Sequence, residues 1–499
     1  MKIKFIVILM LIFAFLTALP VSAIGTDTGA GPSNYTYNYT FWGEEVAMPD
    51  PYYVSAQLTG NDFGIGNFLN PQGLYIRGNR IYVCDTDNNR IVLLEYDESA
   101  DSYSLVKVVE YVVINGQPSP LNKPHDLFEN RNGEIFIADT DNNRVLRLDR
   151  DWNYINSIIK PEDKSYDQSI DFLPMKLVVD HSNRVFIQAR HINKGLMEYN
   201  IDGTFNGFMG ASQVQVSLYD YFWKMISTAA QRSQMELFVP TEYNNVALDH
   251  EGFVYATLST FTGNPFEADP IRRLNAVGTD ILIRNGMFGL AEPAGDWFWG
   301  NLGGVSGPSR FVDVVTFEND GYICLDRNRG RLFAYDFQGN MLYVFGGRGN
   351  MEGRFQDPIA IDRMGTSLFV LDARTAVVTR FNLTQYGSYI DQAINYYYAG
   401  RYDESAAMWD EVLKLNGNYE LAYIGKGRAA LRNEQYRDAM KYYEAKHDRE
   451  SYGKAFQLYR KEWIEANITT IVVILISLWV VTRALRILFK FRKRRKGGA

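Results

Sequence analysis

The hydrophobic and polar positions change their period once along the chain. Between about residues 60 and 384, short apolar runs alternate with Gly, Asn and Asp turns, which predicts β-strands. Runs such as 176–179 and 313–315 are apolar on both faces, so we expect sheets that stack between two neighbours. After Asn382 the period becomes 3.6, which predicts helices.

One segment of the strand-rich region occurs twice with nearly the same sequence. Ile81–Ile91 (IYVCDTDNNRI) returns 54 residues later as Ile135–Val145 (IFIADTDNNRV). Weaker copies cover Gly321–Tyr335 and Thr366–Phe381, and the strand pattern without the Asp-Asn-Asn turn covers Asn183–Tyr199 and Gly252–Leu274. Six units of three or four short strands predict a mainly β fold, a six-bladed β-propeller.

The repeated residues resemble the NHL repeat, whose pattern is Pro, a strand, Gly, a strand ending in Asp, and then Asn-Arg-Val. The resemblance covers about residues 60–384 and implies the same six-bladed propeller. The aromatic segment 24–59, with Tyr52 and Tyr53, is expected to supply the strand that closes the ring onto the last blade.

The Asp-Thr-Asp-Asn-Asn-Arg turn has two interpretations. Asp and Asn side chains bond to nearby backbone groups and tolerate left-handed conformations, and the following Arg can pair with the Asp. Alternatively, the oxygen atoms of Asp85, Asp87 and Asn89 could ligate calcium, although no downstream bidentate Glu completes such a loop. The residues favour the structural turn.

Two aromatic insertions interrupt the repeats. Residues 218–237 have helical spacing and are expected to cover one face, and residues 286–310 contain Trp297, Phe298 and Trp299. An aromatic loop of this kind can stack on sugar rings or peptides, or it can pack against the neighbouring insertion. Both readings of Trp297–Trp299 stay open.

The helical region carries a second repeat. The pattern of residues 400–406 recurs 34 residues later in residues 434–440, and that period is typical of tetratricopeptide repeats. The spacing of small and large residues resembles this family over 386–447, and a further helix is expected to continue to residue 465. The resemblance implies a groove that binds a partner protein.

Both ends of the chain carry membrane signals. Residues 1–23 have the three parts of a secretory signal, and 466–488 are expected to form one transmembrane helix before a basic tail, 489–499. Basic residues stay on the cytoplasmic side, which predicts a single-pass protein of the cell membrane with its body outside the cytoplasm. Without Lys2, Lys4 and the eight basic residues after Thr482, the net charge falls from −7 to −17, which argues against nucleic acid as a partner.

Candidate chemistry is sparse. Two Cys exclude a disulfide scaffold or a Cys-rich zinc module. The propeller resembles gluconolactonase-like hydrolases and amidating lyases, which use a metal at the channel mouth. Where the innermost strands begin, the candidate ligand-binding residues are His125, Asp126, Lys176, Asn245 and Asp313. His125, Asp126, Asn245 and Asp313 could converge on a divalent metal, but the several His of the lyases and the early Glu of the lactonases are missing.

These patterns predict a membrane-anchored extracytoplasmic binding or scaffold protein with no organic cofactor. Its propeller would recognise a protein or carbohydrate ligand, and its helical module would dock a partner protein. The topology is similar to that of bacterial surface proteins that accompany transport or sensing complexes. The alternative is a metal-dependent hydrolase or lyase at the channel mouth.

Overall fold

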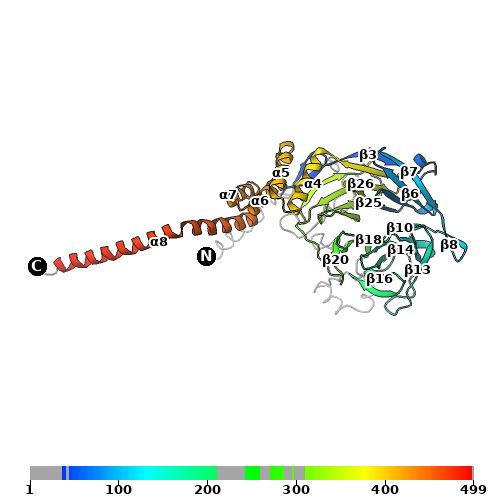
Figure 1. The fold of residues 1–499 in the computed structure, drawn as a ribbon, viewed down its shortest axis with the longest axis horizontal. Helices are drawn as coiled ribbons and strands as arrows, with labels where there is room; N and C mark the ends of the chain where they lie inside the picture. The colour runs from blue at the N-terminus through cyan, green and yellow to red at the C-terminus, as the bar shows by residue number, and fades with distance from the viewer. Residues whose placement is uncertain are drawn as a thin grey trace, which may run out of the picture. The chain divides into compact units, whose positions relative to one another are not determined.

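The computed structural model describes residues 36–40, 44–210, 242–258, 270–285, 295–296 and 309–496. The chain divides into two compact units, Met1–Thr384 and Gln385–Ala499. The first unit consists of antiparallel strands and the second of helices (Figure 1). The predicted signal sequence, the aromatic stretch 218–237 and Trp297–Trp299 lie outside the described residues.

Six sheets form a six-bladed β-propeller in the first unit. Their innermost strands neighbour one another in a closed ring, and the strands of each blade follow in chain order from the channel outward. Blades one and two consist of β4 (Gly73–Arg77), β5 (Arg80–Asp85), β6 (Arg90–Asp97) and β7 (Ser102–Val109), then β10 (Pro124–Glu129), β11 (Ile135–Asp139), β12 (Arg144–Leu148) and β13 (Tyr154–Ile158). A hairpin of β8 (Tyr111–Ile114) and β9 (Gln117–Pro120) connects these two blades.

The other four blades repeat this order. Blade three consists of β14 (Pro174–Val179), β15 (Arg184–Ala189), β16 (Leu196–Asn200) and β17 (Phe205–Met209). Blade four has three described strands, β18 (Tyr243–Leu248), β19 (Val254–Leu258) and β20 (Ile271–Leu274). Blades five and six contain β21 (Phe311–Thr316), β22 (Tyr322–Asp326), β23 (Arg331–Tyr335) and β24 (Met341–Gly346), then β25 (Pro358–Met364), β26 (Ser367–Asp372) and β27 (Val377–Leu383).

The N-terminal segment completes the last blade. Strand β3 (Tyr52–Leu58) pairs antiparallel with β27, with Tyr53 opposite Asn382 and Leu58 opposite Val378. Strands β1 (Tyr37–Tyr39) and β2 (Glu45–Ala47) instead extend the fifth blade beyond β24. Backbone hydrogen bonds between the two ends of the propeller sequence therefore close the ring.

Alternate residues of each central strand face opposite neighbouring blades. Ile81 and Val83 of β5 pack with residues of blade six, whereas Tyr82 and Cys84 pack with residues of blade two. This two-sided burial explains why the strands are apolar on both faces. Cys84 and Cys324 are buried free thiols.

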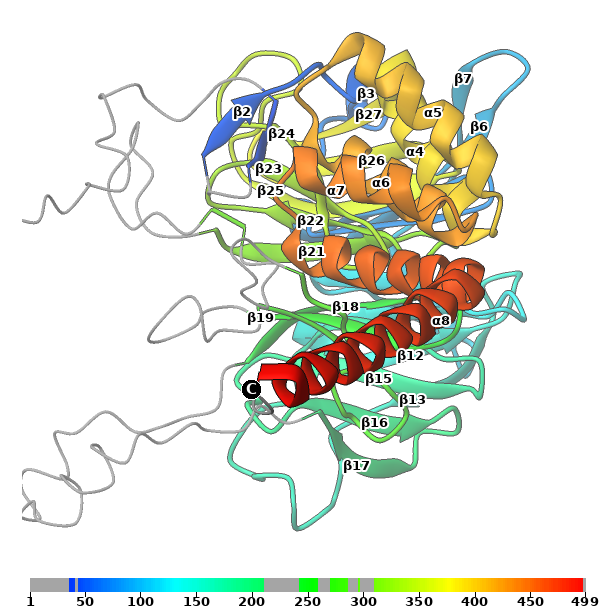
Figure 2. The ribbon, with the colours of Figure 1, turned by 90° about the vertical axis from the view of Figure 1, so that its left-hand side faces the viewer.

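The second unit begins with four helices in which consecutive helices pack together (Figure 2). They are α4 (Gln385–Tyr398), α5 (Tyr402–Leu415), α6 (Glu420–Arg432) and α7 (Tyr436–Ala445). The first turns of α8 (Arg449–Lys496) pack on α7, where Ala455 is completely buried with Ala439 and Tyr443. The start of α8 therefore covers the end of the helical stack.

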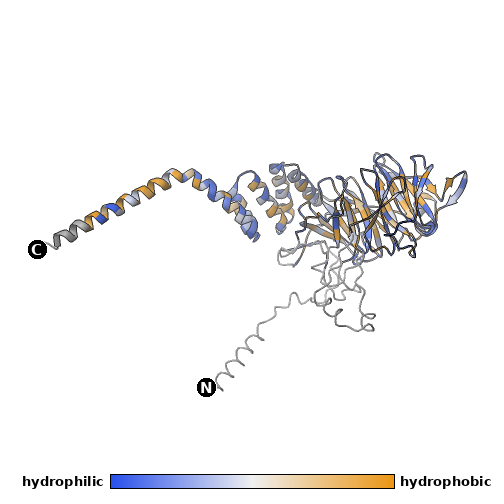
Figure 3. Ribbon diagram, turned by 90° about the horizontal axis from the view of Figure 1, so that it is seen from below, coloured by the Kyte–Doolittle hydropathy of each residue, from blue (hydrophilic) through white to orange (hydrophobic). Residues whose placement is uncertain are grey.

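Helix α8 continues without interruption into an apolar stretch. Its most apolar 18-residue window has a mean hydropathy of 2.2, and no residue of that window is buried against the described chain. The apolar stretch is visible as the orange part of α8 in Figure 3. Its length and exposure are consistent with a membrane anchor.

Candidate functional site

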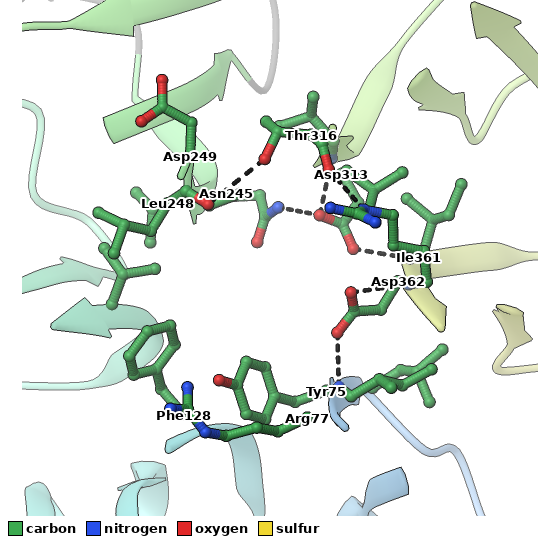
Figure 4. A pocket seen from close by; sticks show the side chains of 18 of the residues that line it. Tyr75, Arg77, Phe128, Asn245, Leu248, Asp249, Asp313, Thr316, Ile361 and Asp362 are labelled. Carbon is green, nitrogen blue, oxygen red and sulfur yellow. Dashed lines mark hydrogen bonds between the residues drawn. The ribbon is translucent and has the colours of Figure 1, made fainter. Parts of the chain in front are cut away.

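The innermost strands of the six blades enclose a cavity of about 460 Å³, the channel cavity (Figure 4). It begins at polar side chains in the first halves of these strands. It extends to the turns that follow the strands, at Gly78, Arg131, His181, His250 and Gly365. The cavity therefore extends toward the ends of the innermost strands, whereas the sequence pattern predicts a site where these strands begin.

Four of the five predicted ligand-binding residues line this cavity, namely Asp126, Lys176, Asn245 and Asp313. The Lys176 Nζ lies 3.4 Å from Asp126 Oδ1 and donates a hydrogen bond to the Gln72 carbonyl at 3.2 Å. The Asn245 amide donates a hydrogen bond to the Asp313 carboxylate. The structure therefore joins these residues into two pairs rather than into one cluster.

A further carboxylate, Asp362 of β25, also lines the cavity. Asp362 could not be recognised from the sequence pattern because Ala360, not Asp362, has the strand register of Asp313. The signal was an Asp that directly follows the buried apolar run Pro358–Ile361 of the same strand. Asp126, Asp313 and Asp362 are called the channel carboxylates below.

Each channel carboxylate accepts a hydrogen bond from the backbone of the next blade. The Asp126 Oδ2 accepts from Leu177 N at 2.9 Å, Asp313 Oδ2 from Ile361 N at 2.7 Å, and Asp362 Oδ2 from Ile76 N at 2.5 Å. An innermost strand is a sheet edge, so its outward N–H groups have no strand partner and need another acceptor. The channel carboxylates therefore link blades two to three, five to six, and six to one.

The enclosed channel shifts the ionisation of these groups. Burial raises the pKa of Asp126, and it raises the pKa values of Asp313 and Asp362 to about 7, against the lowering effect of their hydrogen bonds. Burial disfavours the charged Lys176, but the carboxylates of Asp126 and Asp313 outweigh it and raise the pKa of that ammonium. Lys176 is thus a permanent cation in the channel.

His125 does not line the channel cavity. Burial, together with the positive charges of Lys176, Arg190 and Lys123, lowers its pKa to about 3. A neutral imidazole could ligate a metal, but three cations surround this one. The channel carboxylates already bond to backbone amides, so His125, Asp126, Asn245 and Asp313 do not fit a divalent metal centre.

One acidic group elsewhere has suitable spacing for a cation. Asp249, Glu251 and Asp320 have carboxylate oxygens within 4.8 Å of one another, and they form the one such group in the described ranges. The Arg273 guanidinium lies 2.6 Å from Asp249 and 2.8 Å from each of the other two carboxylates. An arginine already neutralises this group.

The repeated Asp turn is structural in the same way. The Asp85 Oδ2 accepts hydrogen bonds from Arg90 Nε at 2.6 Å and Asn88 Nδ2 at 2.8 Å, and its Oδ1 accepts from Leu69 N at 2.7 Å. Asn89 has a φ of 54°, as its left-handed turn position requires. Asp139 makes the same three bonds in the second blade. These contacts use the carboxylate and favour the turn over a calcium loop.

Comparison with known proteins supports the repeat and little more. Residues 68–92 match the NHL repeat family model. No curated protein matches the chain. Among solved structures, a streptogramin B lyase is 11% identical, with 67% of this chain and 98% of that chain covered and a TM-score of 0.39.

Two other solved structures have a similar level of likeness. A virginiamycin B lyase from Staphylococcus aureus is 11% identical over 67% of this chain and 100% of that chain, with a TM-score of 0.38. KlHsv2 with loop 6CD replaced by a Gly-Ser linker is 9% identical over 63% of this chain and 97% of that chain, with a TM-score of 0.33. Likenesses this distant assign no activity to the chain.

Proposed function

We propose that this chain is a membrane-anchored binding and scaffold protein that holds its propeller outside the cytoplasm. The exposed apolar stretch of α8 carries this proposal, because no described part of the chain covers it. Eight basic and no acidic residues follow Thr482, which favours a cytoplasmic C-terminus. The secretory signal predicted over residues 1–23 requires the same orientation.

The channel chemistry supports binding rather than catalysis. One oxygen of each channel carboxylate accepts a hydrogen bond from the backbone of a neighbouring blade, and the Asn245 amide donates a hydrogen bond to Asp313. A hydrolase or lyase would need a carboxylate or imidazole free to move a proton or hold a metal at the reacting bond.

The helical unit supports the docking part of the proposal. Helices α5 and α7 begin 34 residues apart, at Tyr402 and Tyr436. A Cβ on Gly425 would lie 2.2 Å from Trp409 Nε1, and one on Gly427 would lie 2.7 Å from the Tyr443 ring. Glycine opposite a large aromatic residue is the small-and-large packing of tetratricopeptide-like hairpins. We assign to this unit the binding of a partner protein, such as a component of a transport or sensing complex.

Protease treatment of intact cells tests the topology. The full chain carries an epitope tag after Ala499, and propeller fragments are detected with an antibody against the first blade. We expect external protease to remove the propeller while the tag, with α8, stays protected until the cells are permeabilised. A protected propeller with a digested tag would overturn the proposal.

Crosslinking in intact cells tests the scaffold role. The anchored full chain is crosslinked and recovered, and the proteins recovered with it are compared with those from a control membrane protein that shares only residues 449–499. A membrane complex specific to the full chain supports the proposal. Recovery of the same proteins by both chains would contradict it.

A further inference from the structure

The channel cavity has a lining suited to a ligand rich in hydroxyl groups. Resting on the proposed function, we infer that it binds a neutral polyhydroxylated molecule of about one or two sugar rings, which enters past the turns at Gly78, Arg131, His181 and Gly365. The volume of about 460 Å³ lies within the range of about 300–1,000 Å³ that is usual for small-molecule pockets. The opening is at the ends of the innermost strands, away from His125.

The first observation is an unused acceptor inside the cavity. Asn245 is only 2% exposed, and its Nδ2 donates to Asp313. Its Oδ1 accepts no hydrogen bond from the described residues and points into the cavity (Figure 4). Because this oxygen faces the cavity and not a protein donor, a ligand hydroxyl group can donate a hydrogen bond to it.

The second observation is that donors and acceptors both surround this space. The carboxylates of Asp313 and Asp362 border the cavity, and Lys176, whose Nζ contacts Asp126 and the Gln72 carbonyl, is among the lining residues. A hydroxyl group both donates and accepts hydrogen bonds, so one hydroxylated ligand can use the acceptors and the ammonium together. A ligand that carries only donors or only acceptors would leave part of this lining unpaired.

An aromatic wall lies opposite Asn245. Tyr75 and Phe128 have ring centroids 5.1 Å apart, and both rings border the cavity beside Arg77 (Figure 4). Both side chains remain partly accessible in the otherwise closed propeller. An apolar wall facing a few fixed polar groups is the usual composition of a small-molecule site, and the C–H face of a sugar ring packs on such a wall.

The charges of the lining favour a neutral ligand over an anion or an ammonium ion. Five acidic and four basic side chains line the cavity, namely Asp126, Asp249, Asp313, Glu318 and Asp362 with Arg77, Arg131, Lys176 and Arg363. Two of the acidic groups are partly protonated near neutral pH, which brings the sum close to zero. A ligand with a net charge would therefore find no matching excess of opposite charge.

Ligand-observed NMR on the full chain in phosphatidylcholine nanodiscs tests this inference. The probes are glucose, N-acetylglucosamine, maltose and cellobiose, with choline and citrate as charged comparators. We expect saturation transfer to at least one of the four sugars and none to the comparators. No transfer to any sugar, or transfer to choline or citrate alone, would overturn the inference.

Two variants that fill the cavity locate the binding. Leu248→Trp and Thr316→Trp place a large ring in the cavity from neighbouring blades, and neither replaces a channel carboxylate. Each is expected to weaken sugar binding at least about tenfold, whereas Arg190→Ala, which is exposed and outside the lining, leaves it unchanged. Circular dichroism checks that each variant is folded. One correctly folded Trp variant is enough to decide whether the sugar binds in the cavity. Unchanged sugar binding in a folded Trp variant would show that the ligand lies elsewhere.

The sugar test and the topology test fail independently. A propeller that is digested from outside the cell but binds no sugar leaves the anchored scaffold in place and removes only the ligand class. A propeller protected inside the cell overturns the proposed function, whatever the NMR experiment shows.

Discussion

The second and third blades build the same four-stranded sheet but hold its turn differently. In the second blade β11 ends in Asp139, which pairs with Pro124, whereas the equivalent residue of the third blade is Ala189, opposite Pro174. The fourth blade has Leu258 at this position, opposite Tyr243. In the part of the chain that the structure describes, the blades with an Asp at this position bind the preceding connection to the turn through a buried carboxylate.

This difference separates what makes a blade from what makes the repeat visible in the sequence. The sheet of the third blade persists without the Asp because both of its faces are packed, with Ile187 and Phe186 pointing toward different neighbours. The chain departs furthest from the repeat after the third and fourth blades, where the insertions include residues 218–237 and 286–310. Apolar packing thus specifies the propeller, and the Asp turn restricts where the connections can vary.

Replacing Asp139 is expected to have the largest effect and tests whether the buried Asp stabilises the turn of the second blade. Asp139→Ala removes a fully buried carboxylate that accepts from Asn122 N, Asn142 Nδ2 and Arg144 Nε, and it leaves the Arg144 charge without its partner. We expect a loss of roughly 3–5 kcal/mol in the free energy of unfolding. Urea unfolding of the full chain in micelles, followed by tryptophan fluorescence, measures it.

The neighbouring Asp141 provides the matched control. It lies in the same turn, is exposed, and approaches Lys123 only at 3.8 Å. Asp141→Ala should change the free energy of unfolding by less than about 0.5 kcal/mol. Similar losses in the two variants would show that the buried tie is not what stabilises the turn.

The threonine of the same turn links one blade to the next. The Thr140 Oγ1 donates to the Pro174 carbonyl of the third blade at 2.6 Å, and Thr86 donates to Pro124 at 2.8 Å. Thr140→Val keeps the shape and leaves that carbonyl without its donor, so we expect a loss of about 1–2 kcal/mol in urea unfolding. Arg190, which follows Ala189 in the third blade, is exposed, and Arg190→Ala should have little effect. If Thr140→Val leaves the free energy of unfolding unchanged, the hydrogen bond from Thr140 to Pro174 does not stabilise the contact between the blades.

The sequence predicts the blades well because their signal is local. Strand, turn and Asp recur together, so the ring of six and the strand from Tyr52 that completes it follow from the pattern. The attachment of β1 does not, because it depends on distant contacts. The hydroxyls of Tyr37 and Tyr39 donate to the Asp296 carboxylate at 2.6 and 2.7 Å, across more than 250 residues of sequence.

The candidate site could be predicted only in part for a related reason. Asp126, Lys176, Asn245 and Asp313 share one strand register and could be recognised together, whereas Asp362 has another register. Nothing in the sequence indicates that the channel carboxylates accept from the backbone of the next blade. That function depends on the closed ring, which brings Asp362 of the last blade to Ile76 of the first.

Titration of Asp362 is expected to have the smallest effect on the free energy of unfolding. It tests the contact between the last and first blades, where the ring closes. Burial raises its pKa to about 7, above the value of about 4 of an unfolded Asp. Between these values the folded chain holds the extra proton, so the contribution of Asp362 to stability is largest at low pH and is lost as pH rises toward 7. Asp362→Asn removes this titration but weakens one of the two backbone contacts, to Ile76 N or Arg363 N.

The two effects of Asp362→Asn oppose each other near neutral pH. We expect the variant to be less stable than the wild type at pH 5 and to gain on it by roughly 1 kcal/mol between pH 6 and pH 8. Urea unfolding at pH 5, 6, 7 and 8 measures the difference, and Asp141→Ala, exposed and far from the channel, should show no such trend. A constant difference between Asp362→Asn and wild type would mean that Asp362 does not titrate in this window, and that its link to Ile76 is an ordinary ionised one.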